Sequence, residues 1–421
     1  MTTPALASPR LLVIAAGPLQ VPIIRRAREM GAFVVATDRA ADAPGLRAAD
    51  AGVTVAADDA AGLERVARAF GVTGVVSEQT DAGVLGAATV AARLGLPGIS
   101  VEAARAATDK WTMRRVCAAA GIPVPAHHRV RTLQEAERAA SALGFPVVLK
   151  PTDAQSSRGV VKLTTAAGLA DAWPRCLAES ASGTMLVEEM MVGVESSVEA
   201  FVGDDGAVQI LGICRKDKSA PPASFDLRLT YPGDFPDDVT AALARTHEEV
   251  VRALGISCGL THGEYMVTTA GVRLIEIAAR GCGARVATEL LPAMTGVDVV
   301  GARLRQALGQ SAGDVAPRHR RAGRLEFLLL PPGRVRAVDG LDEARSVPGV
   351  LRVDLAVEAG DRLRPALDGR GRHGAILAVA DDVRALDAIV AEARARLRIT
   401  VDPVEAEPAS SPSGEAAFVS A

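Results

Sequence analysis

Short apolar runs alternate with helix-like stretches along the first hundred residues of the chain. Residues 11–17 (LLVIAAG) predict a buried strand, residues 21–30 a helix and residues 32–38 (AFVVATD) a second strand, and the alternation continues to residue 94. Strands separated by helices of about 10–15 residues are typical of βαβ units. We therefore predict an amino-terminal domain, residues 1–102, built on a doubly wound parallel α/β sheet.

The turn after the first strand reads GPLQVP, beginning at Gly17. A strand, a glycine turn and Asp38 at the end of the second strand suggest a dinucleotide site. The turn lacks the G-x-G-x-x-G spacing whose glycines let the backbone approach a pyrophosphate, so a nucleotide cofactor in this domain has little support.

The pattern changes after residue 102. Residues 103–310 mix helices with strands that read as antiparallel, including a hairpin at residues 204–206 (DDG). Residues 311–402 hold several short strands and a helix near residues 385–398, and residues 403–421 are rich in Pro, Glu, Ser and Ala. We predict a central α+β domain, a carboxy-terminal α+β lobe and a disordered tail over these three ranges.

Composition excludes several classes of function. The 47 basic and 50 acidic side chains give a net charge of −3, and the aromatic residues are few (8 Phe, 2 Trp, 2 Tyr). Such a chain has neither the positive field nor the stacking surface typical of nucleic-acid-binding proteins. Its longest apolar runs are too short to cross a bilayer, and its start lacks a secretory cleavage site. We expect a cytoplasmic protein that binds neither nucleic acid nor membrane.

The cysteines are odd in number and form no CxxC pair. This pattern favours reduced cytosolic thiols over a disulfide scaffold or a structural zinc site. The five residues are Cys117, Cys176, Cys214, Cys258 and Cys282.

Lysine is rare and clustered. Of the 47 basic side chains, only five are lysines, at positions 110, 150, 162, 216 and 218. An ammonium group and a guanidinium group are not interchangeable at a crowded phosphate. The cluster is either chance or the mark of a site that needs ammonium groups, and we favour the site.

Two acidic residues lie on strands joined by a tight turn, in the segment THGEYMVTTAGVRLIEIAAR. Folding this hairpin places Glu264 roughly opposite Glu276, on one face of a largely apolar pair of strands. Two neighbouring carboxylates are costly without a cation, and Mg²⁺ takes one or two carboxylates together with substrate phosphates. The alternative interpretation is a pair of surface acids on a polar face.

Basic and glycine-rich segments surround this hairpin in the sequence. Arg280 precedes Gly281-Cys282-Gly283 and a predicted helix over residues 284–294, an arrangement typical of an anion-binding corner. Lys150 ends a buried strand (VVLKP), and Lys110 begins a helix. The polar loop at residues 153–159 (DAQSSRG) has the composition of a flexible phosphate cover.

Three further residues are ambiguous on their own. Glu188 and Glu195 follow or begin strands and are ordinary when isolated. His262 lies two residues before Glu264 on the same strand face, and is either a base or, more commonly, a packing or hydrogen-bonding residue.

Read in order, these segments resemble the ATP-grasp superfamily: TDKWTMRRVCAAAGIPVP, FPVVLKP, the SSRGV loop, LVEEMMVGVESSVEAF and HGEYMVTTAGVRLIEIAARGCG. The resemblance covers nearly the whole chain. It implies an amino-terminal α/β domain, a central two-lobed nucleotide-binding domain and a carboxy-terminal lobe, with ATP and two Mg²⁺ ions (Mn²⁺ as the alternative ion).

The resemblance also implies a role for each matching residue. Lys110 and Lys150 would hold the phosphates, with a cover formed by Ser156, Ser157 and Gly159. The adenine hinge would run from Glu188 through Glu189 to Met191, and Glu195 would take the ribose hydroxyls. Glu264 and Glu276 would hold the metal ions, and Arg280 would steady the phosphoryl group. The Asn that many members carry two residues after the second metal-binding Glu is Ala278 here, which we interpret as a subfamily marker.

The carboxy-terminal segments SVPGVLRVDLAVEAGDRLRP and GRHGAILAVADDVRALDAIVAEARARLRI resemble those of L-amino acid ligases and related carboxylate–amine ligases. The implied reaction forms an acyl phosphate from a carboxylate and ATP, and an amine then displaces phosphate. The alternatives are a bicarbonate-activating carboxylase-type enzyme of purine biosynthesis and a non-catalytic nucleotide-binding module. We expect small-molecule carboxylate and amine substrates, recognised in part by an irregular loop at residues 216–231 through Lys216, Lys218 or Arg228. A homodimer is a further expectation, because many relatives are dimers.

Overall fold

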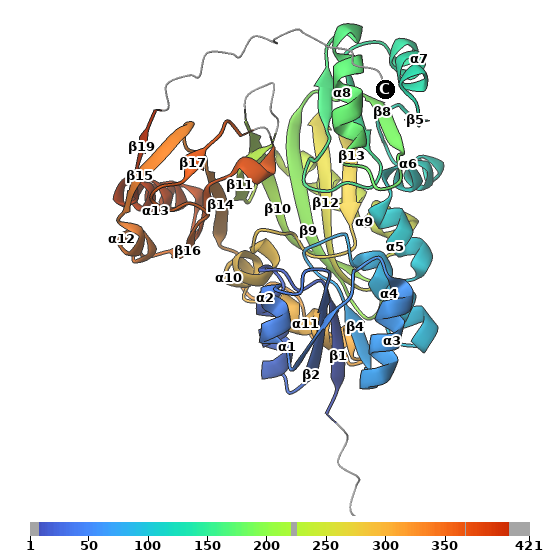
Figure 1. Ribbon diagram of the computed structural model, residues 1–421, viewed down its shortest axis with the longest axis vertical. Coiled ribbons are helices and arrows are strands. Elements are labelled where there is room, and N and C mark those ends of the chain that lie inside the picture. Colours follow the sequence, from blue (N-terminus) through green and yellow to red (C-terminus); the bar gives the residue numbers. More distant parts are fainter. Residues whose placement is uncertain (1–7, 220–224, 367, 404–421) are drawn as a thin grey trace, which may run out of the picture.

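The computed structural model describes residues 8–219, 225–366 and 368–403 (Figure 1). Its amino-terminal part is a four-stranded parallel sheet in the order β3-β2-β1-β4, which confirms the predicted doubly wound sheet. The strands are β1 (Arg10–Ile14), β2 (Phe33–Asp38), β3 (Ala51–Thr54) and β4 (Gly74–Val76), and the helices are α1 (Val21–Glu29), α2 (Pro44–Ala48), α3 (Ala60–Phe70) and α4 (Val84–Leu94).

Helix α3 shows how local sequence defines these elements. The Asp59 side chain caps its amino terminus by accepting a hydrogen bond from the Gly62 N–H. Gly71 ends the helix at φ 58°, a left-handed conformation in which glycine lacks the steric cost of a side chain.

A smaller four-stranded antiparallel sheet, in the order β5-β8-β6-β7, forms the upper right part of the molecule in Figure 1. Helices α7 and α8 pack on it, and α5 and α6 connect it to the amino-terminal part. The elements are β5 (His127–Val130), β6 (Val147–Pro151), β7 (Val161–Leu163), β8 (Met185–Glu189), α5 (Val101–Thr108), α6 (Lys110–Ala119), α7 (Leu133–Leu143) and α8 (Leu169–Leu177).

The largest sheet has eight antiparallel strands in the order β13-β12-β9-β10-β11-β14-β18-β16. Strands β14, β18 and β16 come from the carboxy-terminal part of the chain and join the sheet through the β11–β14 pairing. The strands are β9 (Val194–Val202), β10 (Val208–Lys218), β11 (Asp226–Tyr231), β12 (Gly259–Thr268), β13 (Gly271–Ala278), β14 (Ala322–Leu328), β16 (Val350–Leu355) and β18 (Gly374–Ala380).

The remaining elements flank this sheet. They are the helices α9 (Asp237–Ala253), α10 (Leu291–Thr295), α11 (Val299–Ala307), α12 (Leu341–Arg345) and α13 (Val383–Arg396), and a three-stranded sheet of β15 (Gly333–Asp339), β17 (Arg362–Leu363) and β19 (Arg398–Asp402). The predicted tail falls almost entirely outside the described residues.

The predicted irregular loop at residues 216–231 is wrong where the structure describes it. Strand β10 continues to Lys218, and β11 pairs with it from Asp226 onward. Leu229 and Tyr231 alternate with less buried neighbours in β11, so this segment has the period of two that a strand requires. Residues 220–224 lie outside the described range.

The predicted continuous helix at residues 284–294 is also irregular. Ala284 and Arg285 have positive φ angles of 48° and 65°, and a π-helical turn over Val286–Leu290 leads into α10. The backbone therefore bends sharply after Gly283 before the first helical turn begins.

Among the described residues, none of the helices is both long enough and apolar enough to span a bilayer.

The contact between β4 and α11 provides a stability test. A Cβ atom on Gly74 would lie 2.4 Å from the Ala307 carbonyl oxygen, which belongs to the backbone and has little freedom to move. We expect Gly74→Ala to lower the free energy of unfolding by about 1–3 kcal/mol, measured by urea denaturation. In the control Gly98→Ala, the added Cβ would lie 3.3 Å from the Ala91 Cβ, and the free energy of unfolding should fall by much less. Equal losses of unfolding free energy in the two variants would contradict this packing.

Candidate active site

Glu264 and Glu276 are direct cross-strand partners, which confirms the pairing predicted for this hairpin. A β-bulge makes the pairing possible. Tyr265 pairs with Leu274, but the next pair is Glu264 with Glu276, so Ile275 is an extra residue in β13. In a regular ladder Glu264 would face Ile275, and Glu276 would point to the opposite face of the sheet.

Arg114, in helix α6, supports the bulge. Its Nη2 donates a 2.6 Å hydrogen bond to the Ile275 carbonyl oxygen, and its Nε lies 2.7 Å from Oε1 of Glu188. The side chain of Arg114 is fully buried. A buried guanidinium therefore connects the bulge to the end of β8.

Glu188 faces two cations. Besides Arg114, the Nζ of Lys150 lies 2.6 Å from its Oε2. Burial raises the pKa of the Glu188 carboxyl, but Arg114 and Lys150 outweigh this effect and hold the pKa at about 2. Burial lowers the pKa of Lys150, and Arg114 adds repulsion. The group thus carries excess positive charge, which an anionic ligand would stabilise.

Both hairpin acids are held by lysines. The Nζ of Lys216 lies 2.6 Å from Oε1 of Glu264, and the Nζ of Lys110 lies 2.9 Å from Oε2 of Glu276. Lys216 also contacts Glu195 at 3.1 Å and Asp226 at 3.3 Å. Although burial opposes both shifts, the pKa of Glu264 lies well below, and that of Lys216 well above, its ordinary value.

A first cavity lies between the small sheet and the edge of the large sheet. It collects most of the sequence-predicted residues, although they come from six elements and two loops. The predicted residues that line it are Lys110, Lys150, Ser157, Glu188, Glu189, Met191, Glu195, Glu264 and Glu276. Gly159 lines neither this cavity nor the one described next.

The 153–159 loop lies over both cavities and is tied to its neighbours. The Nζ of Lys110 donates to the Ala154 carbonyl oxygen at 2.5 Å, and the Gln155 side chain accepts from the Asp81 N–H at 2.8 Å. Ser156 and Ser157 both have φ 59°, so the loop turns tightly at the two serines. The loop therefore contacts the amino-terminal domain as well as α6.

At the predicted hinge, Glu188 points into its ion pairs and Glu189 pairs with Arg273. The Glu189 N–H donates to the Ala126 carbonyl, and the Met190 N–H donates to the Pro146 carbonyl. Both backbone N–H groups are therefore already hydrogen-bonded to carbonyl oxygens of this protein. The sequence did not predict these two contacts.

A second cavity shares Ser157, Glu264 and Glu276 with the first. Its walls come from the amino-terminal loops, the 153–159 loop, the large sheet and the carboxy-terminal lobe. Apolar side chains from β11 and β14 meet charged and polar groups there, and the lining includes Ser156, Lys216, His262, Arg280, Phe327 and Arg372. Of the three predicted substrate-contacting residues, only Lys216 lines it; Lys218 lines the first cavity, and Arg228 pairs with Asp217 at 2.7 Å.

Arg280 and His262 are both engaged by acids. Arg280 Nε donates to Asp81 at 2.7 Å, an ion pair between the large sheet and the amino-terminal domain. His262 lies between two carboxylates, with Nδ1 2.8 Å from Glu199 and Nε2 3.2 Å from Glu264. Asp81 and Glu199 carry no motif, and no sequence signal identified them.

Two family models match this chain. Residues 143–289 match the ATP-grasp domain, and residues 326–402 match the L-amino acid ligase C-terminal domain 2. Residues 143–289 therefore form an ATP-grasp domain, and the chain has the ATP-grasp fold.

Individual proteins are similar to this chain in structure or in sequence. The L-amino acid ligase from Bacillus licheniformis superimposes with a TM-score of 0.80 at 23% identity, covering 94% of this chain and 100% of that one. The protein y4rH of Sinorhizobium fredii is 28% identical over 80% of this chain and 70% of its own length. A D-alanine–D-alanine ligase of Aromatoleum aromaticum is 30% identical over 183 residues, 41% of this chain, and the match spans about half (56%) of that enzyme.

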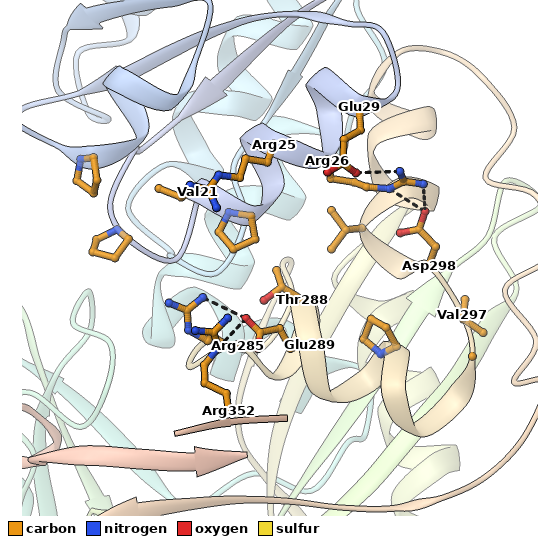
Figure 2. Close-up of a pocket in the computed structure, with 16 residues that line it drawn as sticks. Val21, Arg25, Arg26, Glu29, Arg285, Thr288, Glu289, Val297, Asp298 and Arg352 are labelled. Carbon is orange, nitrogen blue, oxygen red and sulfur yellow. Dashed lines mark hydrogen bonds and ion pairs between the residues drawn. The ribbon is translucent and has the colours of Figure 1, made fainter. Parts of the chain in front are cut away.

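A separate groove in this ATP-grasp protein lies between α1 and the segment from Arg285 to Asp298 (Figure 2). Two ion pairs lie along it: Arg26 pairs with Asp298 at 2.6 Å, and Arg352 pairs with Glu289 at 2.7 Å. Neither Glu264 nor Glu276 lines it.

The ion pairs of Glu188 predict a stability effect. Glu188→Gln leaves Arg114 and Lys150 facing a neutral group in a buried site, and should cost roughly 3–5 kcal/mol of unfolding free energy at neutral pH. The depressed pKa of Glu188 means that its contribution is present above about pH 4.5 and is lost as the pH falls towards 2. The difference between wild type and variant, measured by urea unfolding, should therefore shrink over this interval.

The matched control is Glu189→Gln, the adjacent residue, whose side chain is one-third exposed (34%) and pairs with Arg273. We expect it to cost below about 1 kcal/mol. A Glu188→Gln effect as small as this, or one independent of pH, would show that the buried network does not stabilise the fold.

Proposed function

We propose that this protein is an ATP-dependent carboxylate–amine ligase that joins an amino acid to an amine or to a second amino acid and releases ADP and phosphate. The observation that carries the proposal is the bulge-dependent pairing of Glu264 with Glu276 at the boundary of two adjoining cavities. The family match of residues 326–402 supports an amino acid ligase over other ATP-grasp reactions.

The side chains of the first cavity fit Mg-ATP. Glu264 and Glu276 offer carboxylate oxygens only, the ligand type that Mg²⁺ prefers. Lys110 and Lys150 line the cavity, and Arg114 lies behind it against Glu188. This local group of three cations faces the two carboxylates of Glu188 and Glu276, and its excess positive charge suits a phosphate. Bound Mg²⁺ would neutralise charge on the phosphates during transfer.

We assign the other predicted residues as follows. Lys110 and Lys150 would bind phosphate oxygens, and the loop that carries Ser156, Ser157 and Gly159 would cover them, with Ser157 as its residue in the first cavity. Glu189 and Met191 lie where the adenine would bind, with Glu195 beside the ribose. Because Glu188 is committed to Arg114 and Lys150, its role would be to position the lysine rather than to contact the base.

The second cavity would hold the carboxylate and amine substrates. A carboxylate bound there would take up the phosphoryl group at the boundary formed by Ser157, Glu264 and Glu276, and Arg280 would stabilise the developing charge. The amine would then attack the acyl carbon and expel phosphate, losing a proton as the amide forms. His262, between Glu199 and Glu264, would orient Glu264. The 153–159 loop would exclude water, which otherwise hydrolyses an acyl phosphate.

A substrate screen tests the reaction class. Purified protein with Mg-ATP should release ADP only in the presence of particular amino acids or amino acid pairs. Mass spectrometry should then find a product that is heavier than the first amino acid by the mass of one amino acid residue. A product formed from one amino acid and a simple amine would also support the proposal. ADP release that depends on bicarbonate instead would favour the carboxylase reaction, and no release with any pair would contradict the ligase.

Substitution of Glu276 tests the metal assignment. We expect Glu276→Gln to lower ADP release on the order of 100-fold or more, while ATP binding is weakened but still detectable, because the variant keeps the shape of the site and loses the charge. The control Glu248→Gln alters a carboxylate on α9 that pairs with exposed Arg252 at 3.0 Å, and should leave turnover unchanged. Full turnover in Glu276→Gln would overturn the assignment.

A further inference from the structure

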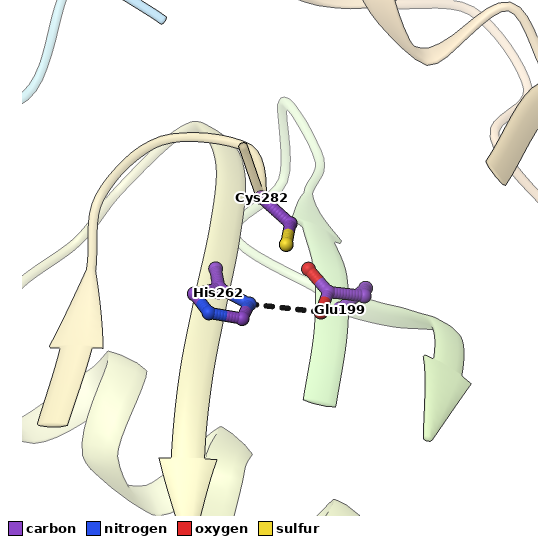
Figure 3. Close-up of side chains that lie close together, drawn as sticks. All are labelled: Glu199, His262 and Cys282. Carbon is purple, nitrogen blue, oxygen red and sulfur yellow. Dashed lines mark hydrogen bonds and ion pairs between the residues drawn. The ribbon is translucent and has the colours of Figure 1, made fainter. Parts of the chain in front are cut away.

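Three side chains with metal-binding atoms lie close together, and two of them, His262 and Cys282, line the second cavity (Figure 3). Glu199 on β9, His262 on β12 and Cys282 in the loop after β13 each offer one ligand atom, and these atoms lie within 4.8 Å of one another. The register places His262 directly opposite Glu199, and the 282 loop leaves β13 beside them. The three residues are 1%, 8% and 7% exposed.

One ligand atom in this cluster has no partner. Glu199 Oε1 accepts hydrogen bonds from the Tyr231 hydroxyl and the Ser197 hydroxyl, each at 3.0 Å, and from His262 Nδ1 at 2.8 Å. Glu199 Oε2 is buried and makes no hydrogen bond with any residue in the described part of the chain. Leaving a carboxylate oxygen buried without a partner is costly, and a cation would remove that cost.

The groups behind the three ligands already have the arrangement typical of a metal site. A histidine that binds a metal through one ring nitrogen usually donates its other N–H to a carboxylate, and His262 Nε2 lies 3.2 Å from Glu264. A ligating carboxylate is usually fixed by further hydrogen bonds, and Tyr231 and Ser197 provide these for Glu199. Binding of an ion would release two protons, one from His262 Nδ1 and one from the Cys282 thiol.

The donor set selects the type of ion. One sulfur, one imidazole nitrogen and one carboxylate oxygen suit Zn²⁺ and similar transition metals, whereas Mg²⁺ prefers oxygen alone. His262 and Cys282 both line the second cavity, so a fourth coordination position would face it. Three protein ligands with one open position distinguish reactive zinc sites from closed structural ones.

We infer that Glu199, His262 and Cys282 form a binding site for one zinc-type divalent transition-metal ion, separate from the magnesium site proposed at Glu264 and Glu276. The open position would accept an oxygen or nitrogen atom of a small molecule in the second cavity. This inference rests on the cluster itself and does not depend on the ligase reaction.

Cobalt substitution tests the site directly. The full chain is stripped with a chelator, dialysed and titrated with Co²⁺ in the presence of excess Mg²⁺, which occupies carboxylate-only sites. We expect one Co²⁺ per chain, with thiolate-to-cobalt charge-transfer absorption and the visible bands of a four-coordinate ion. Equimolar Zn²⁺ should displace the Co²⁺ and remove both features.

Variants identify the ligands. Cys282→Ser should abolish the charge-transfer band and weaken Co²⁺ binding at least about 100-fold, whereas Cys258→Ser, outside the cluster, should bind as the wild type does. Tyr231→Phe removes only a hydrogen bond to Glu199 and should weaken binding by about 10–100-fold while keeping the band. Circular dichroism verifies that each variant is folded, and Cys282→Ala replaces Cys282→Ser if the latter fails to fold.

Two results would overturn the site. Wild-type protein that retains no Co²⁺ in excess Mg²⁺ would show that the cluster is a hydrogen-bonded network without a metal. A charge-transfer band that persists in folded Cys282→Ser would place the ion on another cysteine. Neither result involves ADP release, so the ligase proposal is tested independently.

Discussion

The active-site region depends on a single extra residue in β13. Ile275 shifts the ladder by one position and turns Glu276 to the face that already carries Glu264. Such a bulge leaves a backbone carbonyl without its regular partner, and the Arg114 guanidinium binds that carbonyl. Arg114 is buried and pairs with Glu188, and Glu188 in turn pairs with Lys150. The placement of the paired acids and that of Lys150 are therefore linked through one arginine.

Features set by neighbouring residues could be predicted from the sequence. Helix α3 begins after an aspartate cap and ends at a glycine, and both signals lie in the sequence itself. The parallel sheet follows from the alternation of apolar runs and helices. The hairpin at residue 270 brought the two acids together as expected, but the bulge that aligns them left no sequence signal. The assignment of residues to ATP came from the resemblance of whole motifs and not from spacing alone.

Contacts across the chain could not be predicted, because they depend on strand order. Lys216 meets Glu264, Glu195 and Asp226 only because β10 lies between β9 and β11 and near β12. The cluster of Glu199, His262 and Cys282 joins three segments whose spacing resembles no metal motif. Strand β11 was not predicted because its local pattern is weak. Its alternation of buried and less buried residues is short, and a polar, irregular-looking segment precedes it.

The eight-stranded sheet has a mechanical consequence. Backbone hydrogen bonds run without interruption from β13, which carries Glu276, to β14 and β18 of the carboxy-terminal lobe. Swinging that lobe away would break the whole β11–β14 ladder, so Leu325 and Phe327 form a stationary wall of the second cavity. Among the described strands, the small sheet shares no ladder with this frame. It contacts β13 through side chains such as Arg114 and Glu189, so displacing it would break buried ion pairs and leave the eight-stranded sheet intact.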